Sequence, residues 1–365
     1  MRCDRRQFLL GAASFVACGP KLAKPFNGAA YIASQAARAV SVVNLSRFRL
    51  SKQIALDAEP TAVLANETRV YALTPSNGTV TEIDAATGSV ERRHRMAANA
   101  VSMRIAPDGK SLWLLARDPQ ALIQLDLKSQ RVGRTIKLTR PVLDFDLSTR
   151  APLAVIGSPA ALINLETGRT ERTLGIEGDT IPIRFRPDGK QVIAAHASAR
   201  LLSIADVDTG RLMVKLPMPL EPERFCFSTD NGGQMFVTGR GMDAVVIVSP
   251  YHTAVDETLL AGRAPGSMTV DANNLYVANP ETGDLTVIAI ADRRLLAKIP
   301  VGQDPVQVIV TPDGQYVLSL NRGSSDLSVI RISKIGSDLR GKGAPLFTVV
   351  PLGATPVSAA VCSLA

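Results

Sequence analysis

Aromatic residues are scarce in this 365-residue chain: they make up 4% of it and include a single tryptophan, Trp113. Hydrophobic residues nevertheless amount to 46% of the sequence, so a core must consist mainly of valine, leucine, isoleucine and alanine. The scarcity of aromatic rings also argues against a nucleic-acid surface, which needs such rings for bases to stack on. Nucleic acid is therefore not an expected partner.

Motifs that would indicate a catalytic or cofactor site are missing. The sequence contains no Cys-x-x-Cys-His motif, so no covalently attached haem is expected. It also contains no His-Glu-x-x-His zinc motif and no glycine-rich phosphate loop. No nucleophile is evidently paired with a base. The residues alone therefore predict no catalytic residue, no metal site and no cofactor.

The four cysteines do not indicate a disulfide framework. Cys3 and Cys18 belong to the N-terminal leader described below. Cys226 and Cys362 fall in predicted strands that are far apart in the chain, in different registers. We expect these two to be small buried residues rather than a disulfide.

Basic residues exceed acidic ones, with a formal net charge of +8. Arg2, Arg5 and Arg6 against Asp4 supply +2 of this, which leaves +6 on the rest of the chain. On a body of this size the excess gives only a mild preference for anionic partners. The 23 prolines and 27 glycines are scattered, which predicts many turns rather than a disordered linker.

Residues 1–18 resemble an export signal. Arg5-Arg6-Gln7-Phe8-Leu9 is similar to the twin-arginine motif, which directs folded proteins to the Tat exporter. The apolar run that follows, Phe8–Ala17, has about ten residues and is too short to span a bilayer as a helix. Export to the periplasm or cell envelope is therefore expected.

The end of this leader resembles a lipobox. In Phe15-Val16-Ala17-Cys18-Gly19, Cys18 would become the acylated first residue of a lipoprotein. Residues 19–28 would then be a tether between a lipid anchor and the folded body. The membrane is thus an expected partner through Cys18.

After residue 28 the chain repeats with a period of about 41 residues. Pro-Asp-Gly occurs at 107–109, 187–189 and 312–314, and the separations of 80 and 125 residues are two and three periods. This tripeptide between two runs rich in Val and Ile predicts a hairpin turn between strands. A similar strand recurs eight times, beginning at Val40, Val80, Leu122, Leu162, Leu202, Val245, Leu285 and Leu327.

Four apolar runs in a period near 40 residues are typical of a β-propeller blade. We predict one all-β propeller over residues 29–365 with eight blades, or seven if the unit around 251–260 is irregular. The first unit begins at its second strand, Ala29–Ser34, and the chain ends on a first strand, Pro356–Cys362. A mixed blade built from both ends would close the ring without an open radial edge.

These units resemble the YVTN-type β-propeller repeat of YncE-like surface and periplasmic proteins. The resemblance is carried by the following segments: Leu275-Tyr-Val-Ala-Asn279, Leu285-Thr-Val-Ile, Leu296-Ala-Lys-Ile-Pro-Val-Gly302, Pro305-Val-Gln-Val-Ile-Val and Pro312-Asp-Gly314. It covers nearly everything after residue 28 and implies the propeller fold. It implies no single function, because the family includes scaffolds, binding proteins and enzymes.

The two rims of such a ring differ. Alternating hairpins place the connections between second and third strands beside the loops that enter each innermost strand; this is the varied rim. The Pro-Asp-Gly and Thr-Gly turns lie on the opposite, stereotyped turn rim. Varied loops on a rigid scaffold favour binding, so we expect an unknown protein or an anionic small molecule there. The candidate contacts are Arg38, Arg117, His196, Arg200, Arg240, Asn279, Asn321 and Arg322.

A cofactor-carrying role is one alternative. Eight-bladed propellers include haem d1-binding proteins, and a non-covalent haem d1 needs an axial ligand such as histidine. Of the three histidines, only His196 is expected at the channel mouth, since His94 falls in an outer strand and His252 in the turn rim. Quinoprotein propellers repeat tryptophan in their blades, so the single Trp113 argues against that resemblance.

A lactonase-like, metal-dependent hydrolase is a second alternative. It would need carboxylates that converge in the channel, and Asp144, Asp146, Glu221 and Glu223 lie near predicted innermost strands. Strand alternation sends neighbouring side chains to opposite faces, so we do not expect these four to converge. The preferred prediction is a non-catalytic, monomeric binding module that uses the varied rim.

Overall fold

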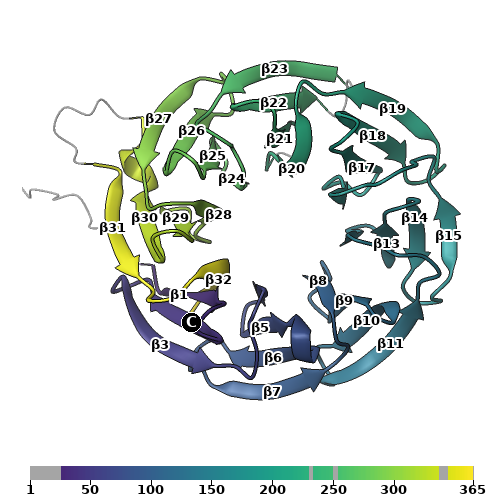
Figure 1. Ribbon diagram of the computed structural model, residues 1–365, viewed down its shortest axis with the longest axis horizontal. Helices are drawn as coiled ribbons and strands as arrows, with labels where there is room; N and C mark the ends of the chain where they lie inside the picture. Colours follow the sequence, from purple (N-terminus) through teal and green to yellow (C-terminus); the bar gives the residue numbers. More distant parts are fainter. Residues whose placement is uncertain (1–25, 230–232, 250–253, 337–343, 365) are drawn as a thin grey trace, which may run out of the picture.

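Eight sheets, each of four antiparallel strands, form a closed ring in the computed structural model (Figure 1). The structure describes residues 26–229, 233–249, 254–336 and 344–364. The expected leader with Cys18, the tether up to residue 25 and His252 lie outside the described residues. The predicted eight-bladed all-β propeller is confirmed, and the alternative of seven blades is wrong.

The strands of each blade are given from the channel outward. Blade 1 consists of β32 (Pro356–Ser363), β1 (Gly28–Ser34), β2 (Ala39–Asn44) and β3 (Arg49–Ala55). Blade 2 consists of β4 (Ala62–Ala65), β5 (Arg69–Thr74), β6 (Thr79–Asp84) and β7 (Val90–Arg95). Blade 3 consists of β8 (Ala100–Ile105), β9 (Ser111–Arg117), β10 (Gln120–Asp126) and β11 (Arg131–Lys137). Blade 4 consists of β12 (Phe145–Leu147), β13 (Leu153–Ile156), β14 (Ala161–Asn164) and β15 (Thr170–Thr173).

The other four blades follow the same order. Blade 5 consists of β16 (Ile183–Phe185), β17 (Gln191–His196), β18 (Leu201–Asp206) and β19 (Leu212–Pro217). Blade 6 consists of β20 (Glu221–Phe227), β21 (Met235–Arg240), β22 (Ala244–Ser249) and β23 (Ala254–Leu260). Blade 7 consists of β24 (Met268–Val270), β25 (Asn274–Asn279), β26 (Asp284–Ala289) and β27 (Leu295–Pro300). Blade 8 consists of β28 (Pro305–Val310), β29 (Tyr316–Asn321), β30 (Asp326–Arg331) and β31 (Leu346–Pro351).

Helical structure in the described residues is limited to two short 3₁₀ turns, η1 (Pro75–Asn77) and η2 (Ile332–Lys334). Among the described residues there is no helix whose length and hydropathy would allow it to cross a membrane.

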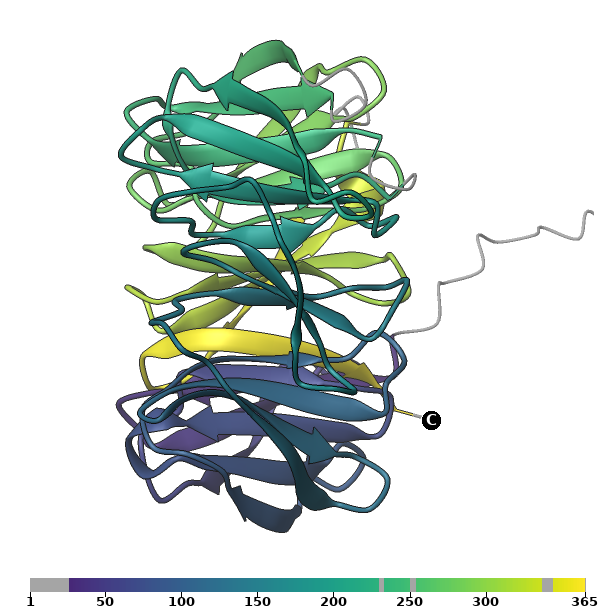
Figure 2. The same ribbon diagram turned by 90° about the vertical axis from the view of Figure 1, so that its right-hand side faces the viewer.

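Blade 1 closes the ring as predicted. β32 pairs antiparallel with β1, from Gly28 opposite Ser363 to Ser34 opposite Pro356. Asn27 and Leu364 extend this pairing through two hydrogen bonds: the Leu364 N–H donates to the Asn27 carbonyl, and the Asn27 amide donates to the Leu364 carbonyl. The two ends of the described chain therefore lie together on the turn rim, at the right in Figure 2.

The core lies between blades rather than within them. Eight apolar clusters are present, one at each boundary between neighbouring blades. Second and third strands are therefore covered on both faces, which explains why β1, β17 and β22 are buried along their whole length. The single tryptophan, Trp113, is 2% exposed in the cluster between blades 3 and 4.

The predicted turns have the chemistry that their residues indicate. Gly109, Gly189 and Gly314 adopt φ values of +67°, +67° and +66°, a left-handed conformation that favours glycine. The aspartate before each glycine accepts a hydrogen bond from the backbone N–H of the residue that follows the glycine. Asp108, for example, accepts from the Lys110 N–H at 3.0 Å. The three Pro-Asp-Gly turns therefore share one backbone conformation.

Candidate functional site

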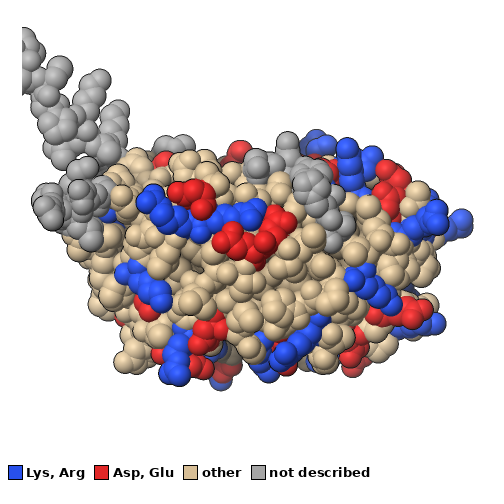
Figure 3. Space-filling view, turned by 90° about the horizontal axis from the view of Figure 1, so that it is seen from above, with Lys and Arg blue, Asp and Glu red and all other residues tan. Residues whose placement is uncertain are grey.

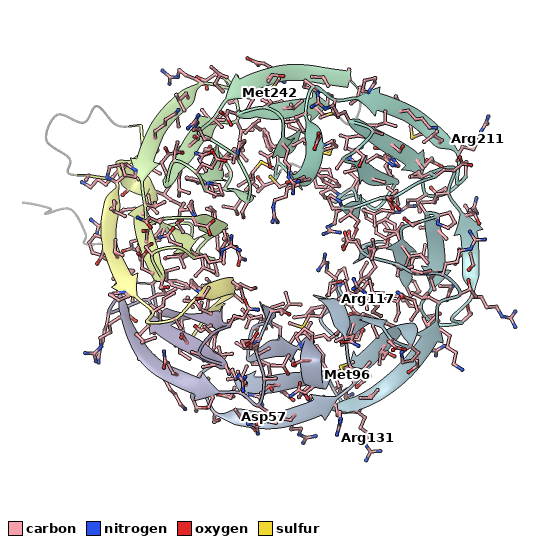
Figure 4. The ribbon with its side chains drawn as sticks, viewed as in Figure 1. Asp57, Met96, Arg117, Arg131, Arg211 and Met242 are labelled. Atoms are coloured by element: carbon pink, nitrogen blue, oxygen red, sulfur yellow. The ribbon has the colours of Figure 1, made fainter. Side chains whose placement is uncertain are left out.

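All eight predicted contacts lie on the varied rim, at or between second and third strands. Arg38 follows β1, Arg117 ends β9, Arg322 follows β29, and the other five end β17, β21, β25 and β29 or lie in the β17–β18 connection. In Figure 4, Arg117 lies toward the inner part of its blade, whereas Arg131 and Arg211 lie on the outer circumference. The eight residues share a rim, but their environments divide them into three groups.

The two asparagines form a buried group that holds loops together. Asn279 and Asn321 are both 0% exposed. The side-chain amide of Asn321 donates to Asp326 at 2.6 Å and to Ser328 at 2.9 Å, and Asn279 makes the same two bonds to Asp284 and Thr286. These side chains stabilise the rim connections and do not face a ligand.

His196 belongs with the asparagines rather than with a ligand site. It ends β17 at the place where Ser34 ends β1 and Asn321 ends β29. At each of these places the side chain bonds to the residue seven positions later: Ser34 to Ser41 at 2.8 Å, His196 Nε2 to Ser203 at 2.8 Å, Asn279 to Thr286 at 2.9 Å and Asn321 to Ser328 at 2.9 Å. The histidine therefore fills a structural position of the repeat.

The protonation of His196 follows from its surroundings. Burial lowers the pKa of the imidazole, an effect that a backbone hydrogen bond with Asp179 opposes. The ring is 8% exposed and lines a cavity of about 400 Å³ together with Glu177, Asp179 and Lys215. With Nε2 bonded to Ser203 and the backbone bond to Asp179, the neutral ring has its polar groups engaged.

The five rim arginines differ in their partners. Arg200, Arg240 and Arg322 form ion pairs with Glu221 (3.7 Å), Glu223 (2.7 Å) and Asp304 (2.7 Å), respectively. Arg38 and Arg117 are exposed and make no side-chain hydrogen bond or ion pair within the described part of the chain. The three exposed ion pairs contribute little to stability. All five guanidinium groups can therefore contact an anion.

The channel wall shows how neighbouring blades are joined. Each innermost strand is an edge strand with backbone N–H groups that its own sheet does not use. Asp144 accepts a hydrogen bond from the Ile183 N–H at 3.2 Å, and Asp146 accepts one from the Phe185 N–H at 2.9 Å. Three further side chains make such bonds at other boundaries: Ser267 with the Val308 N–H, Ser358 with the Val63 N–H and Gln307 with both backbone groups of Ala359.

Two arginines accompany the aspartates on this wall. Arg184 pairs with Asp144, while Arg104 lies 3.5 Å from Asp144 and 3.9 Å from Asp146. Burial raises the pKa of Asp146, against the influence of Arg184, and burial together with Arg184 lowers the pKa of Arg104. The two arginine side chains are still 29% and 28% exposed on innermost strands, so both are partly open to solvent.

Arg224 is the exception on this wall. It takes in β20 the place that Asp144, Ser267 and Gln307 take in blades 4, 7 and 8, four residues before the opening of the first turn. Unlike them it is exposed and makes no side-chain bond to any described residue. Arg224 is thus an exposed cation on an innermost strand without a side-chain partner among the described residues.

The sequence analysis did not include Arg104, Arg184 or Arg224 among its candidates. A signal existed for the first two, because both stand three residues before a Pro-Asp-Gly turn and so occupy the same position of the repeat. The carboxylates that were expected not to converge do so in part: Asp144 and Asp146, two residues apart on one face, both approach Arg104. Glu221 and Glu223 instead pair with rim arginines.

The cysteines and metal-ligating residues offer no further centre. Cys226 and Cys362 are free thiols, and burial raises the pKa of Cys226 to about 12 and that of Cys362 to about 11. No group of three or more histidine, cysteine, aspartate or glutamate side chains is arranged to hold a metal ion within the ranges that the structure describes.

Comparison with known proteins identifies the fold alone. No protein-family model and no curated protein matches the sequence. Among solved structures, the dihydro-heme d1 dehydrogenase NirN in complex with DHE is similar with a TM-score of 0.75 and 14% identity, over 94% of this chain and 78% of that one. A functionally unknown protein from Desulfotomaculum acetoxidans DSM 771 has a TM-score of 0.61 and 13% identity, over 92% and 99% of the two chains. Kuenenia stuttgartiensis hydrazine synthase has a TM-score of 0.56 and 15% identity, over 88% and 99%.

Proposed function

We propose that this propeller is a non-catalytic binding protein that receives an anionic group, of a small molecule or of a protein, at the varied rim and the adjoining channel wall. The observation that carries the proposal is Arg224, an exposed guanidinium group on an innermost strand without a partner among the described residues. At this position other blades have side chains that bond to the neighbouring blade. An unpaired cation there makes no such bond and so gives the fold no benefit. It does provide a strong, charge-assisted contact for a carboxylate or phosphate.

Neighbouring cations extend this proposed site. Arg184, on the innermost strand of blade 5 beside blade 6, and Arg104, on that of blade 3, are partly exposed. On the rim above them, Arg200 and Arg240 are held only by exposed pairs with Glu221 and Glu223. An incoming anion would therefore exchange weak surface pairs for contacts at the channel mouth, where a concave wall excludes part of the water.

The cofactor-dependent alternative has less support from the residues. The chain resembles NirN in fold, and that protein is described in complex with DHE. His196 does not fit the role of an axial ligand, because its Nε2 is bonded to Ser203 and the ring is also held at Asp179. A lactonase-like site would need free carboxylates, whereas Asp144 and Asp146 are engaged by backbone N–H groups of blade 5.

The test is calorimetric titration of the purified protein with tripolyphosphate and with citrate at low salt. Arg224→Gln should weaken binding by about tenfold or more, equivalent to ~1.4 kcal/mol. Arg211→Gln is the matched control, because Arg211 lies on the outer circumference away from the channel (Figure 4). Equal affinity of both variants, or no binding of either anion to the wild type, would overturn the proposal.

Export and anchoring complete the proposed function. If Cys18 carries a lipid, the tether reaches the body next to Phe26, at the turn rim where Asn27 meets Leu364. The varied rim would then face away from the membrane, open to a partner. Replacing Arg5 and Arg6 with lysine should block accumulation in the periplasm, and Cys18→Ser should release the protein from membranes; unchanged fractionation of either variant would remove the corresponding claim.

A further inference from the structure

The outermost strand of every blade has one edge without a strand partner, and one position on that edge is comparable in all eight blades. The residue just after the strand donates its N–H inward, as Met218 does to Arg200 and Ala261 to Asp243. Because backbone groups alternate along a strand, the preceding residue directs its N–H and C=O outward. From blade 1 to blade 8 these outward residues are Ala55, Arg95, Lys137, Thr173, Pro217, Leu260, Pro300 and Pro351.

Most of these edges carry a feature that discourages pairing with another strand. Blades 5, 7 and 8 have proline at this position, which removes the outward N–H without loss of a bond inside the sheet. Blades 2 and 3 have Arg95 and Lys137, and charged residues on an edge also oppose pairing. The outer strand of blade 4, β15, is only four residues long. In blade 1, β3 carries exposed Arg49 and Lys52.

Blade 6 has none of these features. Its outer strand, β23, is seven residues long and contains no proline and no basic residue. The outward position is Leu260, which is 79% exposed and exceeds every other large hydrophobic side chain of the described chain in exposure. Thr258, two residues earlier, also directs its backbone outward. The pairing of β23 with β22 is irregular beside Val248 and regular from Glu257 to Leu260. A regular edge without proline or a basic residue can act as a template for another strand.

The two acidic residues of this strand share one basic partner. Asp256 and Glu257 both pair with Arg293 of blade 7, at 2.9 Å and 3.4 Å. Figure 3 looks onto this side of the ring and shows basic and acidic side chains close together, with uncharged surface around them. Met213 and Leu295, near the start of the outer strands of blades 5 and 7, are also exposed, at 51% and 50%.

We propose that β23 pairs, antiparallel, with β23 of a second copy of this chain. Antiparallel pairing is symmetrical, so two identical edges satisfy each other about a two-fold axis. The ring closes within one chain, so the monomer can fold without the dimer. A single seven-residue strand of about 24 Å buries less area than a standard interface. The dimer is therefore weak and depends on protein concentration.

The experiment is sedimentation velocity from about 1 μM to about 300 μM protein, a range suited to a weak interface. The wild type should shift from monomer toward dimer, and the amides of Thr258 and Leu260 should gain protection from hydrogen exchange at high concentration. Leu260→Pro gives blade 6 the residue that blades 5, 7 and 8 already contain, so it should fold with an unchanged melting temperature and stay monomeric.

Two further variants make the outcome specific. Thr258→Lys keeps the backbone intact and places a charge on the edge, so it should also weaken the dimer. Val132→Ser removes an exposed hydrophobic side chain of blade 3, 44% exposed, and should leave self-association unchanged. A wild type that is monomeric throughout the range, or a Leu260→Pro variant that associates like the wild type, would overturn the proposal.

Discussion

The Nε2 atom of His196 lies 2.8 Å from the Oγ atom of Ser203, in a bond that joins strand ends in four blades of this ring. Serine makes it in blade 1 and asparagine in blades 7 and 8, always to the hydroxyl group seven residues later. The position thus requires a polar group that can reach the third strand. Histidine satisfies it, but the bond does not depend on imidazole chemistry.

His196→Asn should therefore preserve the fold, with the free energy of unfolding changed by about 1 kcal/mol or less, because one neutral hydrogen bond replaces another. His196→Ala should cost about 1–3 kcal/mol, because it leaves the buried Ser203 hydroxyl without a partner. Urea unfolding curves measure both. A visible absorption band that is present in purified wild type and absent from His196→Asn would contradict this structural role and favour a bound tetrapyrrole.

The repeat made the fold predictable in detail. The Pro-Asp-Gly turns and the eight copies of the third strand set the blade count, and the unit that begins at Ala29 and the final strand at Pro356 predicted the closing blade. Each of these features is local or periodic, so one sequence contains the necessary information. The varied rim was found in the same way, since alternation fixes which connections share a side.

The surroundings of individual rim residues were harder to predict from the sequence. Asn279 and Asn321 were expected as contacts because they stand at loop entrances, yet their i+5 and i+7 partners bury them. The Asp144–Arg184 contact joins different blades, and Arg104 reaches Asp144 from a third. Such contacts depend on how neighbouring sheets are rotated, which the pattern within one blade does not specify.

Removing the carboxylate of Asp144 should destabilise the ring. Asp144→Ala would remove the ion-pair partner of Arg184, one of the two carboxylates near Arg104 and the acceptor of the Ile183 N–H, at a cost of about 3 kcal/mol. Asp144→Asn should cost about 1 kcal/mol, because an amide oxygen can still accept from Ile183. Urea unfolding gives both values, with Glu223→Ala, an exposed pair to Arg240, as the control that changes stability little.

The order of these effects is the decisive outcome. If Asp144→Ala were no more destabilising than Glu223→Ala, the aspartate would not join blades 4 and 5 as its bonds indicate.

Deletion of residues 356–365 should prevent closure of the propeller. It removes β32, which supplies the innermost strand of blade 1 and whose Ser358 bonds to the Val63 N–H of blade 2. The loss would exceed about 5 kcal/mol, which is comparable with the whole stability of an ordinary domain. Thermal melting monitored by circular dichroism tests this, with deletion of Ala365 alone as the control. A truncated chain that melts like the full-length protein would show that β32 is dispensable.

The turn aspartates should make the protein sensitive to acid. Asp206 accepts hydrogen bonds from the Thr209 hydroxyl at 2.7 Å and the Thr209 N–H at 2.8 Å, and these bonds lower its pKa from the ordinary 3.8. Asp84 and Asp126 make equivalent bonds, and their pKa values are also lowered. Because the folded pKa lies below the unfolded one, the stabilisation is complete above pH 3.8 and is lost as the pH falls through the folded pKa.

Substitution of all three turn aspartates by asparagine should therefore flatten the decline of stability between about pH 5 and about pH 2. The turn itself should persist, since Asn164 occupies this position in blade 4 and accepts from the Thr167 N–H at 2.9 Å. Asp208→Asn is the control, because Asp208 is exposed and its one ion pair, with Arg150, is long at 3.5 Å. The measurement is urea unfolding across this pH range. An unchanged slope in the triple variant would mean that the acid sensitivity arises elsewhere, with the partly buried Asp146, whose pKa is raised, contributing in the opposite sense.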